Sequence, residues 1–363
     1  MRPISILLLY ANYTGNKTLS YQRGWPRHFL RHSGFSCTLL NLAQQGWMER
    51  LKNHVVAWRG DFEAVVILHS VFSNRCFLSD KLVRTLRACP QPKVLFLGNE
   101  YKLMPEKMNL CEHLSVALVV SQSHSVVIHH LYRSRLGCQV MNLPNTGLDP
   151  EVFFSRKGWR ERSIDIGYRA QDAPLYLGHN EKRVLAEYFT TYARRQAMKV
   201  DISLDPADRF TEEGWAGFLN ECKAQLGAEA GSDYFELTDQ TRRSVNTYVA
   251  RHPQATLEEV FERFFRDYPN PICGRMLSSR HIEAAGTKTV QILLAGEYGG
   301  YFLPNVHYIP LNKDFSNIGE VIMKFRDEQY CAGIAEKAYE LVRERLTYER
   351  LLTQLHMALR MVV

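Results

Sequence analysis

Short apolar segments alternate with amphipathic stretches along the first half of the chain, and this alternation constrains the fold more than any other feature. Strands are predicted at 4–10, 36–40, 64–68, 93–97, 116–120 and 139–143. Helical patterns lie between them, for instance at 79–88 and 123–132. Continuous apolar strands separated by helices predict a parallel sheet with both faces covered, which is a doubly wound α/β domain.

A second α/β alternation begins after the basic stretch 156–162. Strands are predicted at 164–168, 200–204, 290–293 and 308–310, and helices at 181–195, 212–225, 238–251 and 257–265. From residue 318 onward the pattern is almost continuously helical, and 341–357 is amphipathic. A length of 363 residues suits two such domains. The predicted boundaries are 1–155, 156–340 and a C-terminal helix, 341–363, that packs back toward the first domain.

The positive charge is concentrated in the first half of the chain. Residues 1–150 hold 17 Lys and Arg against 8 Asp and Glu, and the remainder holds 28 against 30. Such a balance suits an anionic partner: a phospholipid surface, a lipid pyrophosphate or an acidic glycan. A solvated basic face explains it equally well. No zinc-finger, RNA-recognition or helix-turn-helix signature accompanies the charge, so nucleic acid is not an expected partner.

Cellular location is predicted from what the sequence contains. No stretch approaches the roughly 20 apolar residues of a membrane span, and the first residues do not resemble a signal peptide. The eight cysteines are scattered without a Cys-x-x-Cys pair, which favours buried, reduced thiols. We therefore expect a cytoplasmic protein, with peripheral contact to the inner face of the membrane through the basic half.

Polar residues follow most strands of the first predicted sheet. They are 12–15 after the first strand, His69 after the third, Asn99 and Glu100 after the fourth, Ser121 and Gln122 after the fifth, and the turn 144–149 after the last. Ligands of parallel α/β sheets collect beyond the carboxyl ends of the strands. These residues therefore predict a cleft at that edge of the sheet.

Three segments of the second half carry candidate ligand-binding residues. Arg169 ends a strand and, with Lys182 at a helix start, suits a diphosphate; Arg169 paired with Asp172 and a solvated Lys182 are the alternatives. In 226–232, Glu229 lies between glycines, and Gly231 and Ser232 follow it; a helix C-cap at Gly227 is the alternative. In 278–286, Arg280 and Glu283 lie near a predicted helix start, where Glu283 is expected to be exposed; a capping box is the alternative.

Two longer stretches of the sequence also carry a family resemblance. Residues 144–153, read as P-x-x-G-x-D-x-x-x-F, resemble the junction that closes the N-terminal domain of group 1 (family 4-like) glycosyltransferases with the GT-B fold. Residues 278–317, read as S-x-R-x-x-E-A … Q-I-L-x-x-G-x-Y … H-Y-I-P-L … D-F-S-N, resemble their donor-binding module, and the spore-maturation-protein-like branch is the nearest match. The likeness covers most of 93–350. It implies two Rossmann-like domains that face a cleft.

The resemblance implies a glycosyltransferase that moves a sugar from a nucleotide-sugar to a glycan or lipid-linked acceptor, in bacterial surface polysaccharide synthesis, with retention of configuration. Its Glu-x7-Glu pair would be completed by Glu283, but Arg275 stands at the first position. Glu229 is the candidate replacement. The predicted site residues are Glu229, His69 and Glu100 as catalytic groups, Arg169, Lys182, Gly231, Ser232, Arg280 and Glu283 for the donor, and Asn12, Gly15, Asn145 and Asp149 for the acceptor side of the cleft.

Neither a metal nor another cofactor is expected, because the chain has no Asp-x-Asp motif to hold a divalent ion against the diphosphate. The absence of Gly-x-Gly-x-x-Gly argues against a nicotinamide dehydrogenase. Two rival functions remain open. The missing contiguous Glu pair supports a non-catalytic partner or glycan-binding subunit, and His69, Glu100 and Glu229 keep open a nucleotide-sugar epimerase.

Overall fold

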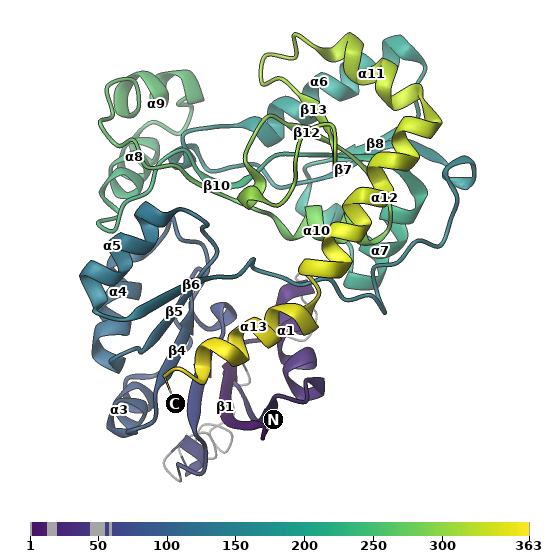
Figure 1. Cartoon of the computed structure of the whole chain (residues 1–363). Coiled ribbons are helices and arrows are strands. Elements are labelled where there is room, and N and C mark those ends of the chain that lie inside the picture. Colours follow the sequence, from purple (N-terminus) through teal and green to yellow (C-terminus); the bar gives the residue numbers. More distant parts are fainter. Residues whose placement is uncertain (1, 13–19, 44–54, 58–59, 363) are drawn as a thin grey trace.

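The first lobe of the protein is built on a six-stranded parallel sheet. A computed structural model describes residues 2–12, 20–43, 55–57 and 60–362 (Figure 1). The strands are β1 (Ile4–Tyr10), β2 (Phe35–Asn41), β3 (Ala64–Ile67), β4 (Lys93–Phe96), β5 (Leu118–Ser121) and β6 (Gln139–Asn142). They lie in the order β2-β1-β3-β4-β5-β6, and every neighbouring pair is parallel. The six predicted strands are confirmed to within two residues at each end.

Helices cover both faces of this sheet. On one face lie α1 (Ser20–Arg31) and α13 (Tyr348–Leu359), and on the other lie α3 (Asp80–Ala88), α4 (Met104–Leu114) and α5 (Val126–Leu136). Side chains of a strand alternate between the faces, so Leu8 of β1 joins the cluster of Trp25, whereas Leu7 joins the cluster of Leu82. This double coverage explains why β3, β4 and β5 are buried along their whole length.

The second lobe repeats this arrangement on five parallel strands. They are β7 (Ile164–Arg169), β8 (Val200–Ser203), β9 (Cys222–Gly227), β12 (Val290–Leu294) and β13 (Ile309–Leu311), in the order β13-β12-β9-β7-β8. Helices α6 (Glu181–Gln196) and α11 (Ile318–Arg326) pack on one face, and α7 (Glu212–Glu221) and α10 (Ser279–Gly286) pack on the other. Helix α12 (Glu328–Arg345) contacts both α10 and α11. The prediction of two doubly wound domains is confirmed.

The prediction of a helix over 212–225 is confirmed as far as Glu221 and wrong beyond it. Helix α7 ends at Glu221, and Cys222–Gly227 is strand β9, the centre of the second sheet. Ala, Gln and Leu favour helices locally, but pairing with β7 on one side and β12 on the other outweighs that preference. Gly227 is therefore a strand residue and not a helix C-cap. At Gly167 of β7, a β-carbon would lie 2.2 Å from Cys222 Sγ, so only glycine fits beside this strand.

The end of the chain crosses back to the first lobe. The C-terminal helix predicted over 341–363 is interrupted, because α12 ends at Arg345 and α13 begins at Tyr348. At the crossing, Leu148 N donates to Leu346 O (2.7 Å) and Tyr348 N donates to Leu148 O (3.3 Å). Tyr348 also packs edge-on against Trp25 of α1, with ring centroids 5.2 Å apart. Residues 144–153 thus lie beside the C-terminal crossing, and α13 completes the core of the first lobe (Figure 1).

A helical hairpin forms a second contact between the lobes. Helices α8 (Gln240–Arg251) and α9 (Leu257–Phe264) lie between the short antiparallel strands β10 (Ala230–Ser232) and β11 (Gly274–Met276). Asp239, which precedes α8, accepts a hydrogen bond from Leu103 N (3.1 Å), and Arg243 pairs with Glu106 of α4 (2.9 Å). Figure 1 shows α8 and α9 above α4 and α5 on the side of the molecule opposite α12.

The remaining predictions concern thiols and the membrane. All eight cysteines lie in the described part and are free; Cys89, Cys111, Cys222 and Cys331 are buried as expected, whereas Cys76 and Cys273 are exposed. No helix in the ranges described above combines the length and the hydrophobicity that a transmembrane span requires.

Candidate active site

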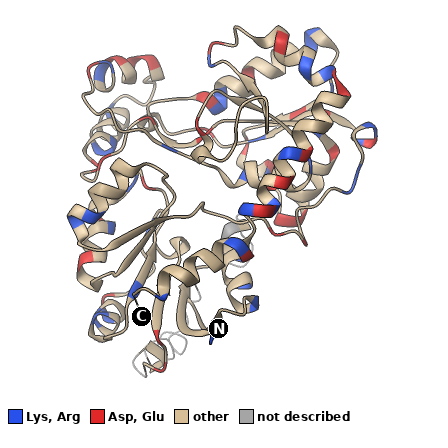
Figure 2. Cartoon of the chain, viewed as in Figure 1, with Lys and Arg blue, Asp and Glu red and all other residues tan. Residues whose placement is uncertain are grey.

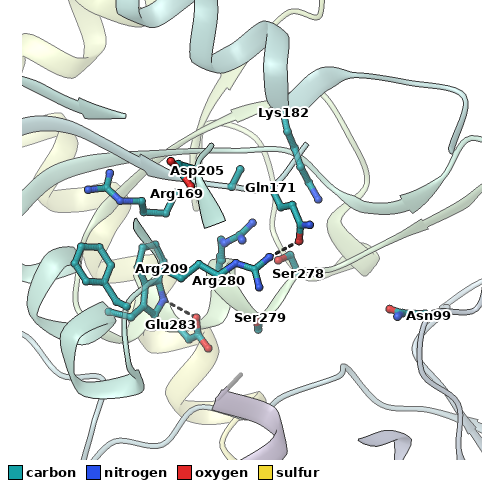
Figure 3. A pocket seen from close by; sticks show the side chains of 13 residues that line it. Asn99, Arg169, Gln171, Lys182, Asp205, Arg209, Ser278, Ser279, Arg280 and Glu283 are labelled. Atoms are coloured by element: carbon teal, nitrogen blue, oxygen red, sulfur yellow. Dashed lines mark hydrogen bonds between the residues drawn. The ribbon is translucent and has the colours of Figure 1, made fainter. Parts of the chain in front are cut away.

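A pocket of about 270 Å³ opens where the second lobe faces the first. It lies beyond the carboxyl ends of β7 and β8 and at the starts of α6 and α10, where ligands of such sheets collect (Figure 3). Asn99, which follows β4, is the lining residue that comes from the first lobe. The lining residues are Asn99, Arg169, Ala170, Gln171, Lys182, Asp205, Arg209, Phe210, Trp215, Ser278, Ser279, Arg280 and Glu283.

The pocket holds positive charge that the protein does not neutralise. Among the described residues, neither the Lys182 ammonium nor the Arg280 guanidinium has a hydrogen-bond or ion-pair partner on a side chain or the backbone. Arg209 donates to the neutral side chain of Gln171. Burial, together with the neighbouring charges of Arg280 and Arg275, lowers the pKa of Lys182 to about 8. Such a pocket favours an anionic ligand, because an anion would supply the missing partners.

Two helix N-termini add to this positive potential. Lys182 is the second residue of α6, and Arg280 is the second residue of α10. The residues that precede these helices, Asn180 and Ser278, make no side-chain capping hydrogen bond. First-turn amides therefore add their partial positive charge to the two side chains, which is the arrangement that binds phosphate groups in many proteins.

Arg169 lines the pocket but does not direct its charge into it. Its Nη2 donates to Asp201 Oδ1 (2.8 Å), its Nη1 donates to the carbonyls of Tyr168 and Asp201, and its guanidinium lies 4.5 Å from the ring centroid of Phe218. Figure 3 shows the guanidinium pointing away from Gln171 and Arg280. Arg169 was expected to offer a free positive charge, but it only lines the pocket. Asp172, its alternative partner, pairs with Arg183 instead.

Glu283 also lies in the pocket, but it is not exposed as predicted. It is the fifth residue of α10, is 3% exposed and accepts hydrogen bonds from Trp215 Nε1 (2.7 Å) and Ser20 Oγ. The capping-box alternative is wrong too, because Ser278 makes no side-chain cap bond. Burial raises the pKa of Glu283, against the lowering effect of these hydrogen bonds. Through Ser20 of α1, this carboxylate joins the two lobes beside the cations.

We expect Glu283→Ala to destabilise the protein by about 1 to 3 kcal/mol, because the change leaves two buried donors without an acceptor. Glu283→Gln keeps one acceptor oxygen and should lose less. Urea unfolding followed by fluorescence measures both variants, with the surface change Glu340→Ala as the reference for a solvated carboxylate. Wild-type stability of Glu283→Ala would show that the two hydrogen bonds do not contribute.

The predicted catalytic residue Glu229 and the predicted donor residues Gly231 and Ser232 lie outside this pocket's lining. Glu229 is 8% exposed and accepts from Tyr298 N (2.7 Å), and burial raises its pKa. Gly231 has a φ of +91° and pairs with Arg275 across β10 and β11, where a β-carbon would meet Gly274 O at 2.0 Å. The Ser232 hydroxyl donates to Tyr234 O (2.5 Å). The structure gives these three residues internal partners, and their roles toward a ligand stay predictions.

The two candidates of the first lobe, His69 and Glu100, are buried within it. His69 Nε2 lies 2.9 Å from the carbonyl of Asn145, and burial lowers the pKa of His69 to about 4. Glu100 is 1% exposed and accepts hydrogen bonds from Ser121 Oγ, Gln122 N and Tyr132 OH at 2.6 to 2.7 Å. The structure does not bring either side chain into the pocket with Arg280. This burial weakens the case for both as catalytic groups.

The predicted acceptor-side residues also make internal contacts. Asn12 exchanges two hydrogen bonds of 3.0 Å with Asn41. The carbonyl of Asn145 accepts from Trp25 Nε1 (2.8 Å). Asp149 Oδ2 lies 3.0 Å from His28 Nε2; burial raises the pKa of this carboxyl, but His28 and Arg27 lower it overall. Gly15 lies outside the described residues.

Sequence reasoning missed several lining residues. Gln171 and Ala170 follow β7, and Asp205, Arg209 and Phe210 follow β8. The rule that selects polar residues after the strands of the first sheet would have selected Gln171, Asp205 and Arg209 in the second. Trp215 gave no such signal, because a Trp in an amphipathic helix reads as a core residue.

The chain resembles known proteins in structure but not in sequence. No protein-family model and no curated protein sequence matches the chain. The structure is similar to that of HepE from Anabaena in complex with UDP-glucose, with a TM-score of 0.53 and 11% identity over 98% of this chain and 99% of that one. It is also similar to sucrose-phosphate synthase from Thermosynechococcus elongatus (TM-score 0.52, 10% identity, 99% and 98% coverage).

A third similar structure is AviGT4, a glycosyltransferase involved in avilamycin A biosynthesis, with a TM-score of 0.51, 12% identity, and coverage of 99% of this chain and 98% of that one. The chain has the GT-B fold. Within a GT-B molecule the pocket lies on the second domain and opens toward the first, with Asn99 across from the cations. The likeness to the spore-maturation-protein-like branch stays a prediction.

Proposed function

We propose that this GT-B protein is a glycosyltransferase that takes a sugar from a nucleotide-sugar. The observation that carries the proposal is the pair of partnerless cations, Lys182 and Arg280, at two helix starts in one pocket. A nucleoside diphosphate carries adjacent negative charges, and it would supply partners for both cations at once. HepE, which has the same fold, has been crystallised with UDP, with UDP-glucose and with UDP and glucose, and this supports a uridine diphosphate donor.

We propose different tasks for the two domains. The second domain would hold the donor, since it supplies the cations of the pocket, and the first domain would present the acceptor from the side of Asn99. In the transfer, the bond between the sugar C1 and the diphosphate oxygen breaks, and its electron pair leaves on the diphosphate. An acceptor oxygen bonds to C1 and loses its proton. Charge grows on the diphosphate, so Lys182, Arg209 and Arg280 stabilise the transition state more than the bound donor.

These three cations are also the reason for proposing that transfer needs no metal ion, since they take over the neutralisation of the leaving group. We extend the proposal to a glycan or lipid-linked acceptor of a bacterial surface polysaccharide, on the strength of the sequence resemblance and the basic first half. Retention of configuration stays open, because Arg275 stands where the resemblance calls for a carboxylate.

The test is incubation of the purified protein with a panel of nucleotide-sugars, with and without acceptor extract and with and without EDTA. Release of nucleotide that requires both acceptor and donor and persists in EDTA supports the proposal. Release that EDTA abolishes and magnesium or manganese restores contradicts metal independence. Conversion of the donor to its epimer without acceptor would identify the epimerase.

A non-catalytic GT-B subunit is the second candidate. It is favoured by the residue at position 275, where the resemblance calls for a carboxylate. Arg275 stands there instead, and its ion pairs with Glu181 and Asp233 neutralise its charge. Binding of UDP without turnover of any nucleotide-sugar, in the presence of active acceptor extract, would select it over the transferase.

The pKa of Lys182 leads to a prediction about pH. With a free-state pKa of about 8, the ammonium is charged at neutral pH, and a bound diphosphate should raise that pKa. UDP affinity should therefore be constant just above neutral pH and fall about tenfold per pH unit once the pH exceeds about 8. Calorimetric titration above about pH 7, where the terminal phosphate of UDP is already ionised, measures the profile. Lys182→Arg keeps its charge over this range, and a pH profile that it leaves unchanged would contradict the assignment.

The first domain has a surface suited to an anionic membrane. Helices α3, α4 and α5 cover one face of its sheet and carry several Lys and Arg residues (Figure 2). Val126 and Val127 at the start of α5 are 76% and 49% exposed. The exposed basic residues of these helices are Lys81, Arg84, Arg87, Arg133 and Arg135, against the carboxylates Asp80, Glu106 and Glu112. We propose this face as the site of peripheral membrane contact.

Each basic residue near an anionic surface contributes about 1 kcal/mol. The triple change Lys81→Glu, Arg84→Glu and Arg87→Glu should therefore abolish co-sedimentation with phosphatidylglycerol vesicles at low salt. The double change Arg194→Glu and Arg195→Glu, on the second domain, is the control and should leave sedimentation unchanged. Wild-type protein that ignores these vesicles, or that binds them equally at high salt, contradicts the proposal.

A further inference from the structure

Arg275 is the centre of a buried ion-pair network beside the pocket. Its side chain is 6% exposed, and its Nη1 and Nη2 donate to the two carboxylate oxygens of Glu181 at 2.7 and 3.1 Å. Its Nε donates to Asp233 Oδ1 at 2.7 Å, and Lys313 Nζ lies 2.9 Å from Glu181 Oε1. Both oxygens of Glu181 are therefore held by cations other than Lys182.

Glu181 is the direct sequence neighbour of Lys182, and both lie in the first turn of α6. Opposite charges attract strongly in a poorly hydrated environment, so a released Glu181 carboxylate would be drawn to the partnerless ammonium. An ion pair between them would neutralise the charge that the diphosphate needs. The bidentate contact with Arg275 prevents this, since it fixes the carboxylate in a geometry that uses both oxygens.

We propose that Arg275 is a positioning residue, which holds Glu181 away from Lys182 and so keeps Lys182 free to bind the diphosphate of the donor. The inference rests on the proposed function for its ligand, but its geometry is a property of the free protein. It also gives Arg275 a task of its own at the position where the family resemblance calls for a carboxylate.

The charges around Lys182 agree with this arrangement. Burial lowers its pKa most, Arg280 of α10 and Arg275 of β11 lower it further, and Glu181 of α6 raises it least. Asp205, Arg209 and Glu283, which also line the pocket, and Lys313, which binds Glu181, are the other charged groups near this cluster.

The experiment compares UDP dissociation constants of Arg275→Leu, Glu181→Gln and the double variant by calorimetry. Arg275→Leu should weaken UDP binding about tenfold or more, because the freed Glu181 pairs with Lys182. Glu181→Gln alone should bind UDP as the wild type does. The double variant should recover most of the lost affinity, since the competing carboxylate is gone. If Arg275 were needed only for folding, removing the Glu181 carboxylate would not restore UDP affinity.

Arg242→Leu is the matched control, because Arg242 is also a largely buried arginine paired with a carboxylate, Asp239, and it lies outside the pocket lining. It should leave UDP affinity unchanged. Wild-type affinity in Arg275→Leu, or an affinity loss that Glu181→Gln does not restore, overturns the proposal. If Arg275→Leu is unfolded by circular dichroism, Arg275→Lys, which cannot bind Glu181 bidentately and Asp233 together, replaces it in the same comparison.

A measurement without ligand separates this inference from the proposed function. The pKa of Lys182, followed by NMR in the free protein and assigned with Lys182→Arg, should rise by about one unit or more in Arg275→Leu and return in the double variant. If wild-type protein binds no UDP, the proposed donor fails, but a pKa that rises in Arg275→Leu and returns in the double variant still supports the inference. Loss of the Arg275 charge alone predicts a rise that the double variant keeps. Either that result or an unchanged pKa overturns the inference.

Discussion

Replacing both Lys182 and Arg280 by Met should abolish measurable UDP binding and, at the same time, make the free protein more stable. Each charge-assisted hydrogen bond to the diphosphate contributes about 1.5 to 3 kcal/mol, so the pair accounts for roughly two to four orders of magnitude in affinity. No other pair of residues in the pocket is expected to have an effect of this size, because Arg169 is already bound to Asp201 and Arg209 to Gln171.

The gain in stability follows from the same absence of partners. The pKa of Lys182 is lower in the folded protein than in the unfolded chain, so below about pH 8 its charge opposes folding. Removing it at neutral pH should add about 1 to 3 kcal/mol to the free energy of unfolding. Urea unfolding and calorimetric titration of the same samples measure both effects, with Lys199→Met, an exposed lysine of the same domain, as the control. Wild-type UDP affinity in the double variant would place the donor elsewhere.

Gly147→Ala should destabilise the protein by about 2 to 3 kcal/mol, the range expected for overpacking a site that cannot adjust. A β-carbon at Gly147 would lie 2.6 Å from Tyr348 N and 2.8 Å from Tyr348 Cα. These are backbone atoms at the start of α13, and the neighbouring hydrogen bonds between Leu148 and residues 346 and 348 hold them in place. The added methyl group would therefore have to separate the C-terminal crossing from the turn at 144–149.

The control for this change is Gly319→Ala in α11, where nothing lies within 4 Å of the new carbon. Alanine favours a helix over glycine by up to about 1 kcal/mol, so this variant should be slightly more stable than the wild type. Urea unfolding ranks the two variants, and limited proteolysis near residues 346–347 reports whether α13 has loosened. A Gly147→Ala protein as stable as the wild type would show that the crossing accommodates the methyl group.

The sequence predicted the strands of the first sheet well because their signal is local. Strands β1, β3, β4 and β5 are short, largely apolar runs, and burial on both faces requires that composition. The prediction was wrong at 222–227 because Lys, Ala, Gln and Leu have no strong preference for strands. This segment is a strand because it pairs with β7 and β12, which are distant in sequence.

In the candidate site, too, local patterns could be predicted from the sequence and contacts between distant residues could not. Lys182 and Arg280 were predicted from polar residues at helix starts, which is a local pattern. The direction of Arg169 was not, because Phe218 and Asp201 capture its guanidinium from other elements. The burial of Glu283 depends on Ser20 of α1, 263 residues earlier in the chain. Contacts between residues so far apart in the chain leave no pattern in the local spacing of residues.

The position of α13 determines when the core of the first lobe can be completed during translation. Trp25, Phe29 and the inner side of β1 belong to one cluster with Leu351, Leu352 and Leu355 of α13, so this face of the first sheet is completed by a helix far from its strands in the sequence. The strands of the first lobe are translated before α13, so that face stays uncovered until the ribosome has made α13. Because the same cluster extends into α7 and α10, the two lobes share one core and reach their native packing together.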